Sequence, residues 1–360
     1  MRILFVTLGN ELVASSRTRV FQYLPHLKLQ GATCRIIQYE SSMHYLVLSK
    51  LQRDTFLKKL FVYFTLKLIH LYNYFYSFLS NLQLIYYCSK YDVVFIQKAL
   101  PPVFIQKILQ KKNPNIVFDF DDAIYADKIS YEIQRFDYLC SHVKLAVIEN
   151  DNTGRYMHKR GIRTVKITGP IDCGRYKPKE NADRARKKII IGWIGSASTT
   201  DYLKMIAKPL QYISAKYEHV TFMLIGAKTL QLEGCKIQYE EWNLQSEVSL
   251  LEQFDIGIMP LPDNEWTQGK GGYKLLQYMA MGIPCITSPV GVNKEMVADG
   301  QSGFWAEPDS AWIESFEKLI TDDSLRASMG KCARKIALDK YSFEVSTPRL
   351  YAELQRLAEV

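Results

Sequence analysis

Short apolar segments alternate with longer amphipathic segments along the chain, and this alternation restricts the fold more than any other feature. Each apolar segment has the length of a buried strand, and most intervening segments can form a helix. Strands separated by helices form βαβ units, so the pattern predicts an α/β protein with parallel sheets between helical layers. The predicted strands are Ile3–Thr7, Cys34–Gln38, Val93–Gln97, Ile116–Phe120, Leu145–Glu149, Thr164–Ile167, Ile189–Ile194, Thr221–Ile225, Ile237–Tyr239, Ile256–Met259 and Pro284–Ser288.

The strand series restarts once, which predicts two domains. A polar, basic stretch occupies residues 175–188, and a new apolar strand follows it, so the junction lies near residues 168–188. A chain of 360 residues also suits two domains of roughly 100–200 residues each. We predict a Rossmann-like N-terminal domain over residues 1–170 and a second Rossmann-like domain over residues 171–340. A C-terminal helix over residues 341–360 is expected to pack back toward the N-terminal domain.

Net charge and cysteine content restrict the partners and the compartment. The formal net charge of +9 favours an anionic partner, such as nucleotide phosphates, a membrane surface or nucleic acid, although a solvated basic surface explains it equally well. The chain contains no basic recognition helix or RNA-binding signature, so we expect no nucleic-acid partner. Seven cysteines without a C-x-x-C pair indicate neither a disulfide framework nor a zinc ribbon, and they suit a reducing cytoplasm.

Residues 43–90 form an aromatic and aliphatic segment between two predicted strands. Leu68–Tyr87 carries no formal charge, but several polar side chains interrupt it, and each would need a partner in lipid. Three interpretations remain open: a helix at the membrane interface, buried or domain-packing helices, and a membrane-spanning helix. The interfacial interpretation rests on the basic residues that precede the uncharged stretch, which are Lys50, Arg53, Lys58, Lys59 and Lys67.

A glycine-rich loop lies between the strand Ile256–Met259 and a predicted helix. Three glycines, Gly269, Gly271 and Gly272, allow the backbone to approach a ligand closely. The helix that follows presents unpaired N–H groups and a partial positive charge. Lys270 and Lys274 are four positions apart and can share one face of the helix. The loop is therefore predicted to bind a diphosphate; the alternative is a flexible loop with two solvated lysines.

Two further loops follow predicted strands of the same domain. Gly195-Ser196 comes after Ile189–Ile194, and Val290-Gly291 comes after Pro284–Ser288. Ligands of open α/β sheets bind outside the carboxyl ends of strands, so we expect the loop at Val290-Gly291 to contribute to the same anion site.

These segments together resemble the donor site of the large family of retaining glycosyltransferases with the GT-B fold, glycosyl transferases group 1, family 4 in the usual classification. Residues 191–196 and 264–284 carry the similarity in the second domain. Residues 15–19 and 169–172 carry it more loosely elsewhere. The similarity implies two Rossmann-like doubly wound domains that face each other across a cleft.

The resemblance also implies a reaction. A sugar would pass from a nucleotide diphosphate sugar to an acceptor hydroxyl with retention of configuration, without a cofactor and without a bound metal. The aromatic, basic segment of the first domain suggests a lipid-linked acceptor and an anionic membrane surface. Such an enzyme would be cytoplasmic or peripheral on the inner face of the plasma membrane, and would serve bacterial cell-surface polysaccharide or glycolipid synthesis.

The chain departs from the family at two positions. The family usually has two glutamates eight positions apart, and here Gly269 and Gln277 occupy those positions. The second glutamate of the family holds the ribose diol, and the amide of Gln277 can still hydrogen-bond hydroxyls. The first contacts the donor sugar, and we expect Glu265 to take its place from four residues earlier.

Charged residues after the strands of the first domain are candidates for the acceptor side. Arg17 and Arg19 follow the first strand and can bind phosphate or an acidic acceptor; alternatively both belong to an exposed helix turn. Asp121 and Asp122 follow the strand Ile116–Phe120 and can orient or deprotonate an acceptor hydroxyl, or cap a helix. Residues 149–152 follow another strand, where helix capping explains them as well as acceptor binding does.

Two alternatives to a glycosyltransferase remain. The absent glutamate pair is compatible with a catalytically inactive partner that binds nucleotide sugars. An epimerase of the same fold would act on the nucleotide sugar itself, but it requires acid–base groups around the sugar that the sequence does not display.

Overall fold

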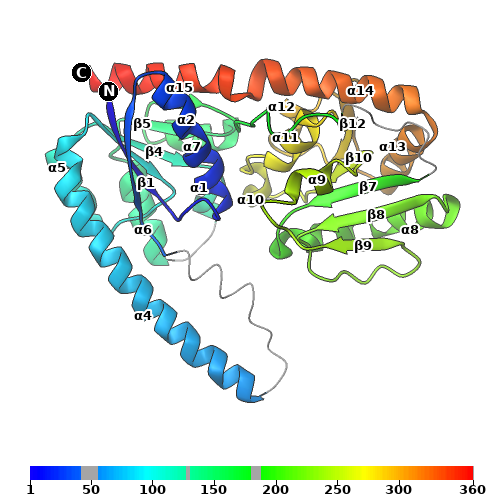
Figure 1. The fold of residues 1–360 in the computed structure, drawn as a ribbon, viewed down its shortest axis with the longest axis horizontal. Helices are drawn as coiled ribbons and strands as arrows, with labels where there is room; N and C mark the ends of the chain where they lie inside the picture. The colour runs from blue at the N-terminus through cyan, green and yellow to red at the C-terminus, as the bar shows by residue number, and fades with distance from the viewer. Residues whose placement is uncertain (42–55, 127–129, 180–187, 360) are drawn as a thin grey trace. The chain divides into compact units, whose positions relative to one another are not determined.

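The computed structural model describes residues 1–41, 56–126, 130–179 and 188–359. The chain forms two compact units (Figure 1). Unit 1 comprises Met1–Ile167 and Thr347–Val360, and unit 2 comprises Thr168–Ser346. Each unit contains one six-stranded sheet, and all recorded strand pairs within the sheets are parallel. The predicted α/β class with two parallel sheets is confirmed.

The sheet of unit 1 has the strand order β2-β1-β3-β4-β5-β6. Its inner strands are buried on both faces, which explains their continuous apolar runs. The predicted strands agree with the observed ones to within about two residues, the usual uncertainty of strand ends. The observed bounds are β1 Arg2–Thr7, β2 Thr33–Gln38, β3 Val93–Gln97, β4 Ile116–Phe120, β5 Leu145–Ile148 and β6 Thr164–Lys166.

The sheet of unit 2 has the strand order β12-β11-β10-β7-β8-β9. Five of its strands were predicted, but the edge strand β12 (Gly303–Trp305) was missed. Three residues that begin with glycine give too short an apolar pattern to indicate a strand. The other bounds are β7 Ile189–Ile194, β8 Val220–Ile225, β9 Ile237–Glu240, β10 Ile256–Met259 and β11 Cys285–Thr287.

Helices connect the strands in both units. Unit 1 contains α1 Ala14–Arg19, α2 Leu24–Leu29, α4 Phe56–Tyr87, α5 Val103–Lys112, α6 Ser130–Cys140 and α7 Asp151–His158. Unit 2 contains α8 Ala207–Lys216, α9 Glu247–Leu251, α10 Glu265–Gln268, α11 Tyr273–Ala280, α12 Asn293–Met296, α13 Asp309–Thr321 and α14 Asp323–Ile336. The last helix, α15 (Phe343–Ala358), begins in unit 2 and continues into unit 1, where Leu350 and Leu354 are buried and Glu353 pairs with Arg163.

Two glycines in the centre of the second sheet bring aromatic rings onto its strands. Gly192 of β7 and Gly257 of β10 are register partners. A Cβ atom on Gly192 would lie 2.1 Å from the ring of Phe254, and one on Gly257 would lie 2.5 Å from the ring of Tyr278. Real Cβ atoms do not approach so closely, so both positions require glycine. Because Tyr278 belongs to α11, this packing holds α11 close to β10.

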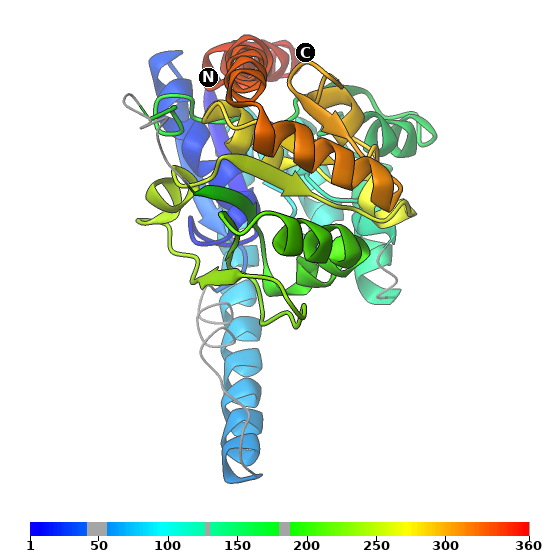
Figure 2. The same cartoon turned by 90° about the vertical axis from the view of Figure 1, so that its right-hand side faces the viewer.

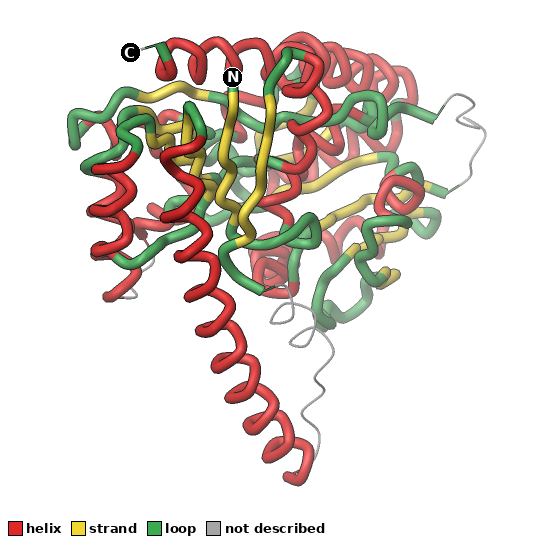
Figure 3. The backbone as a smooth tube through the Cα atoms, turned by 60° about the vertical axis from the view of Figure 1, so that its left-hand side comes forward, coloured by secondary structure: helices red, strands yellow, loops and turns green. Residues whose placement is uncertain are grey.

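Helix α4 contains 32 residues and extends past the ends of the strands of unit 1 (Figures 1, 2 and 3). It confirms the prediction of a helical segment for residues 56–87. The rest of the predicted segment before α4, residues 43–55, lies outside the described part of the chain. Within the described ranges, no helix is both long enough and apolar enough to cross a bilayer.

Candidate functional site

Three neighbouring strands of unit 2 end at the predicted donor site. In the order β11-β10-β7, each is followed by a loop that carries predicted site residues. Gly195 follows β7, residues 264–272 follow β10, and Val290-Gly291 follows β11. Parallel strands place their carboxyl ends at one edge of the sheet, where ligands of α/β proteins bind.

Contacts join these three loops to one another. A Cβ atom on Gly195 would lie 3.1 Å from Lys274 Nζ, so the β7 loop and the α11 side chain are neighbours. A Cβ atom on Gly291 would lie 2.8 Å from the carbonyl oxygen of Gln268, which joins the β11 loop to α10. Val290 is buried and Gly269 is the C-cap residue of α10. The structure therefore brings most of the predicted donor residues together.

Gly272 is the N-cap residue of α11 and has the left-handed φ of 71°. A Cβ atom there would also lie 2.8 Å from Val292 and 2.9 Å from the Met296 sulfur, so both conformation and space select glycine. The glycine turn ends at the start of α11, and the first N–H groups of an α-helix have no acceptor within the helix. Gly271 immediately precedes this turn and is partly exposed. The turn thus presents backbone donors to an anion.

Lys274, in the first turn of α11, is the most perturbed cation of the site. Its ammonium lies 4.4 Å from the ring centroid of Trp193. Among the described residues, no carboxylate lies within ion-pair distance of it. Burial, together with the charge of Lys270, lowers the pKa of Lys274 to about 7. The site therefore holds a desolvated cation that an anionic ligand would stabilise.

The remaining loop residues lie nearer to solvent. Lys270 Nζ lies 5.0 Å from the ring centroid of Trp266. Glu265 is exposed and begins α10. Ser196 is also exposed; it is the N-cap residue of the 3-10 helix η4 (Ala197–Ile206), and its Oγ lies 2.8 Å from that of Ser198. Glu265 and Ser196 are thus open to solvent, whereas Gln277 is buried.

Gln277 belongs to a buried polar network that was missed in the sequence. Its Nε2 donates to the hydroxyl of Tyr176 at 3.4 Å, and this hydroxyl donates to a carboxylate oxygen of Glu247. Trp242 Nε1 donates to the other carboxylate oxygen of Glu247 at 2.6 Å. Burial, with the nearby Glu247 carboxylate, raises the pKa of Tyr176 to about 12. A carboxylate from α9 thus lies two hydrogen bonds from the position where the family has glutamate.

Arg19 lies in the core of unit 1, not on an exposed helix turn. Its side chain is 2% exposed and pairs with Asp119 and with Glu149, whose Oε1 is 2.8 Å from Nη1. It also donates to the carbonyl oxygen of Ile167 at 2.8 Å. Arg17 is buried too, and its Nη1 donates to the carbonyl oxygen of Glu11 at 3.0 Å. The guanidinium of Arg19 is therefore already committed to two buried carboxylates.

Asp121 and Asp122 share one lysine at the ends of β3 and β4. Lys98 Nζ lies 2.8 Å from Asp121 Oδ1 and 3.2 Å from Asp122 Oδ2. Lys98 has a φ of 56°, rare for a residue with a side chain, and the hydrogen bond from Ala99 N to Gln97 O closes a turn around it. The two carboxylates raise the pKa of Lys98 despite its burial. Lys98 was missed; its signal was its place directly after the predicted strand Val93–Gln97.

The residues that follow β5 serve the fold. Asn150 is the N-cap residue of α7, and its Oδ1 accepts from the backbone N–H of Thr153 at 3.0 Å. The Thr153 hydroxyl completes a capping box. Helix capping, one of the two interpretations above, therefore accounts for Asn150.

Sequence comparison matches residues 188–322 to the family described as glycosyl transferases group 1. The chain is 32% identical over 114 residues to alpha-1,3/1,6-mannosyltransferase ALG2 of Homo sapiens, which covers 31% of this chain and 26% of that protein. It is 24% identical over 166 residues to the capsular polysaccharide biosynthesis glycosyltransferase CapM of Staphylococcus aureus, which covers 43% of each chain. The chain thus matches less than half the length of these curated relatives.

Solved structures show the same fold over nearly the whole chain. Alr3699/HepE of Anabaena, crystallised with UDP and glucose, has a TM-score of 0.71 at 13% identity and covers 99% of this chain and 100% of its own. Sucrose-phosphate synthase of Thermosynechococcus elongatus has a TM-score of 0.73 at 11% identity and covers 99% of both chains. The chain therefore has the two-domain GT-B fold, and its residues 188–322 are similar to glycosyl transferases group 1.

Proposed function

We propose that this chain transfers a sugar from a nucleotide diphosphate sugar to an acceptor hydroxyl, with retention of configuration. The observation that carries the proposal is Lys274, a desolvated cation beside Gly195 at the start of α11. An anion bound there would contact the ammonium and the N–H groups of the helix start together. The binding of UDP and glucose by the structurally similar Alr3699/HepE supports a nucleotide sugar as that anion.

The geometry suits departure of a diphosphate. Negative charge develops on the diphosphate oxygen as the bond to the sugar breaks. Lys274, Lys270 and the N–H groups after Gly272 would stabilise that charge because they are positioned before the reaction starts. Gln277 is buried and its amide donates to the hydroxyl of Tyr176, so the proposal assigns it no direct contact with the nucleotide.

Asp121 and Asp122 supply the carboxylates of the proposed acceptor side. Each has a partly exposed side chain, and Lys98 holds both in place. A carboxylate oxygen can accept the proton of a hydroxyl or orient it. The acceptor is proposed to be lipid-linked, in bacterial cell-surface polysaccharide or glycolipid synthesis. A peripheral site on the inner face of the plasma membrane belongs to the same proposal.

A donor screen followed by a transfer assay tests the proposal. Nucleotide sugars that bind the folded state raise its melting temperature, and the stabilising donor is then incubated with lipid-linked glycan acceptors. We expect a glycosylated lipid by mass spectrometry and loss of product in Asp121→Asn and Asp122→Asn. Stabilisation without turnover of any donor would instead favour the non-catalytic partner, and isomerised nucleotide sugar would favour the epimerase.

The pH dependence of donor binding tests the role of Lys274. In the unliganded protein the pKa of Lys274 is about 7. Bound diphosphate raises it, so the complex holds more protons than the unliganded protein does. The affinity for the diphosphate is therefore highest below pH 7 and falls by up to about tenfold per pH unit above it. Calorimetry with UDP-glucose in buffers of different ionisation enthalpy should show proton uptake at pH 8. Lys274→Arg, which stays charged, should abolish this uptake; a pH-independent affinity in the unsubstituted protein would contradict the assignment.

Gly195→Ala tests the packing between the β7 loop and Lys274. The added methyl carbon would lie 2.5 Å from the Trp193 ring and 3.1 Å from Lys274 Nζ. The Trp193 ring must therefore shift, and the Lys274 ammonium, 4.4 Å from the centroid of that ring, must shift with it. We expect an affinity loss for UDP-glucose of about tenfold, which corresponds to about 1.4 kcal/mol. Gly174→Ala is the control, since Gly174 is exposed and its Cβ position meets only Asp172 Oδ1, at 3.3 Å; equal affinities for the two variants would refute the predicted contact.

A further inference from the structure

Helix α4 carries large apolar side chains on the face that points away from unit 1. Six of them define what we call the outer face of α4: Leu68, Leu71, Tyr72, Phe75, Phe78 and Leu82. Phe75 is 58% exposed and Leu71 is 67% exposed. At about 100° per residue, these six positions fall within a sector of roughly 120° on the helix surface.

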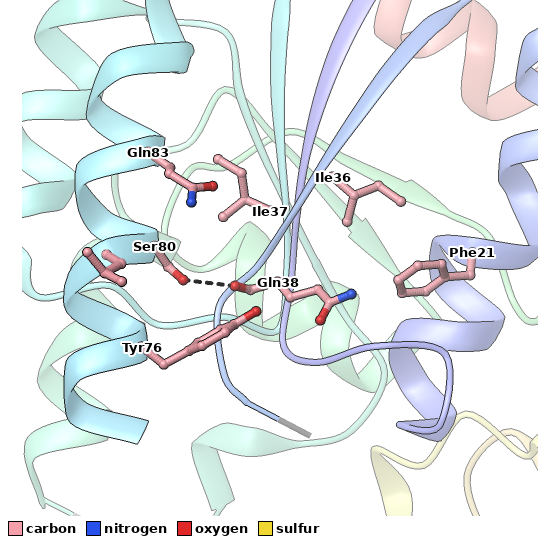
Figure 4. Close-up of a pocket in the computed structure, with 8 residues that line it drawn as sticks. Phe21, Ile36, Ile37, Gln38, Tyr76, Ser80 and Gln83 are labelled. Carbon is pink, nitrogen blue, oxygen red and sulfur yellow. Dashed lines mark hydrogen bonds between the residues drawn. The ribbon is translucent and has the colours of Figure 1, made fainter. Parts of the chain in front are cut away.

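The opposite face of α4 is already engaged. Ile69, Ser80 and Leu84 are buried, and Ser80 Oγ donates to the carbonyl oxygen of Gln38 at 2.9 Å (Figure 4). This bond satisfies a backbone acceptor of β2, the edge strand of the sheet. A cavity of about 320 Å³ between the helix and β2 includes Tyr76 and Gln83 among its lining residues. The helix thus has one face packed on its own unit and an apolar face left over.

The apolar outer face of α4 indicates contact with a partner or with a membrane. A helix that is apolar all round is normally buried in a protein core or in a membrane. Contiguous exposed apolar patches of this kind mark sites of protein or membrane contact. The charge of the helix decides between these occupants.

Every formal charge in the sequence of α4 and of the turn after it is positive. From Thr55 to Tyr91 the sequence contains Lys58, Lys59, Lys67 and Lys90 and no aspartate or glutamate. Pairing with a second copy of α4 would bring like charges together, whereas an anionic bilayer would attract them. Tyr72 and Tyr74, 47% and 77% exposed, have an apolar ring and a polar hydroxyl, which suits the boundary between lipid and water.

We infer that the outer face of α4 binds the surface of an anionic lipid bilayer. The aromatic and aliphatic side chains enter the boundary between headgroups and acyl chains, and the lysines remain at the headgroups. The helix then lies in the plane of the interface and does not span it. This inference deepens the proposed function, because it assigns the peripheral membrane site of that proposal to named residues. It does not require sugar transfer, and its test contains no nucleotide sugar, so the two can fail separately.

Vesicle flotation of the full chain tests the inference. We expect binding to vesicles of phosphatidylcholine with phosphatidylglycerol, and weak binding to phosphatidylcholine alone. Phe75→Ser with Phe78→Ser should lower the partition coefficient by at least about tenfold, because each removes a large apolar group from the interface. Phe104→Ser with Leu29→Ser is the control, since these two side chains are 63% and 85% exposed and lie outside α4. Equal binding to both vesicle types, or equal losses in variant and control, would overturn the inference.

A fluorescence measurement tests the inference without relying on the folding of the serine variants. All five tryptophans of the chain lie between residues 193 and 312, in unit 2. Phe78→Trp therefore introduces a reporter on the outer face, and brominated phosphatidylglycerol vesicles should quench it beyond the unsubstituted protein. Sedimentation without lipid examines the rival occupant: a dimer that Phe75→Ser with Phe78→Ser dissociates, together with no added quenching, would assign the face to a second copy and overturn the inference.

Discussion

Replacement of Lys270 and Lys274 together by alanine is expected to reduce the affinity for UDP-glucose by at least about a hundredfold. Hydrogen bonds to charged groups contribute about 1.5–3 kcal/mol each, and two such contacts are lost. Isothermal titration calorimetry measures the change. The pKa of Lys274 is lowered to about 7 because its charge is desolvated, so its removal should not lower the stability of the unliganded protein. Lost affinity with an unchanged or higher melting temperature therefore separates a binding defect from a folding defect.

The control for that variant must carry the same change in net charge. Lys208 on α8 and Lys331 on α14 are both exposed, and their joint replacement by alanine also removes two positive charges from unit 2. General electrostatic attraction of the anionic donor would be weakened in both double variants, and salt would reduce it. If the control lost as much affinity as the Lys270 and Lys274 variant, the diphosphate would not sit at the start of α11.

The sheets were predictable because buried parallel strands leave a continuous apolar run in the sequence. The prediction of β7 from Ile189–Ile194 needed only such a run. The anion site was likewise predicted from the residue types of the glycine-rich loop alone. Strand β12 failed the same criterion because Phe304 and Trp305 follow polar residues and glycine and form no longer apolar run, whereas the equally short β11 lies within one. The position of a strand along the chain is a local property, so a short stretch of sequence is enough to predict it.

The polar networks were not predictable because their members are far apart in the sequence. Arg19 meets Asp119 across 100 positions, and Gln277 meets Tyr176 across 101. Arg19 was interpreted as a ligand for phosphate or an exposed residue, since an arginine on a short polar helix gives no local sign of burial. Lys98 and Glu247 similarly resemble surface residues until the neighbouring strands or helices are known. Which charges meet depends on strand order, and one sequence does not display strand order.

Replacement of Arg19 by leucine is expected to destabilise unit 1 by roughly 3–5 kcal/mol. The substitution leaves Asp119 and Glu149 buried without their cation, and loss of one partner of a buried ion pair has this cost. Hydrogen exchange measured by mass spectrometry should show lower opening free energies for β1, β4 and β5. The strands β7, β8 and β10 of unit 2 provide an internal reference because they belong to the other compact unit.

The matched control is Arg2→Leu, at the first residue of β1 in the same unit. Its ion pair with Asp92 has a half-exposed arginine, so the loss should remain below about 1 kcal/mol. Burial raises the pKa of Asp119 and of Glu149, and Arg19 opposes both shifts. Without Arg19 the folded carboxyls take up protons more readily than the unfolded ones, whose ordinary pKa is about 4. The stability deficit of Arg19→Leu should therefore grow as the pH rises from about 5 to 8, and a deficit as small as that of Arg2→Leu at both values would show that Arg19 does not hold the core together.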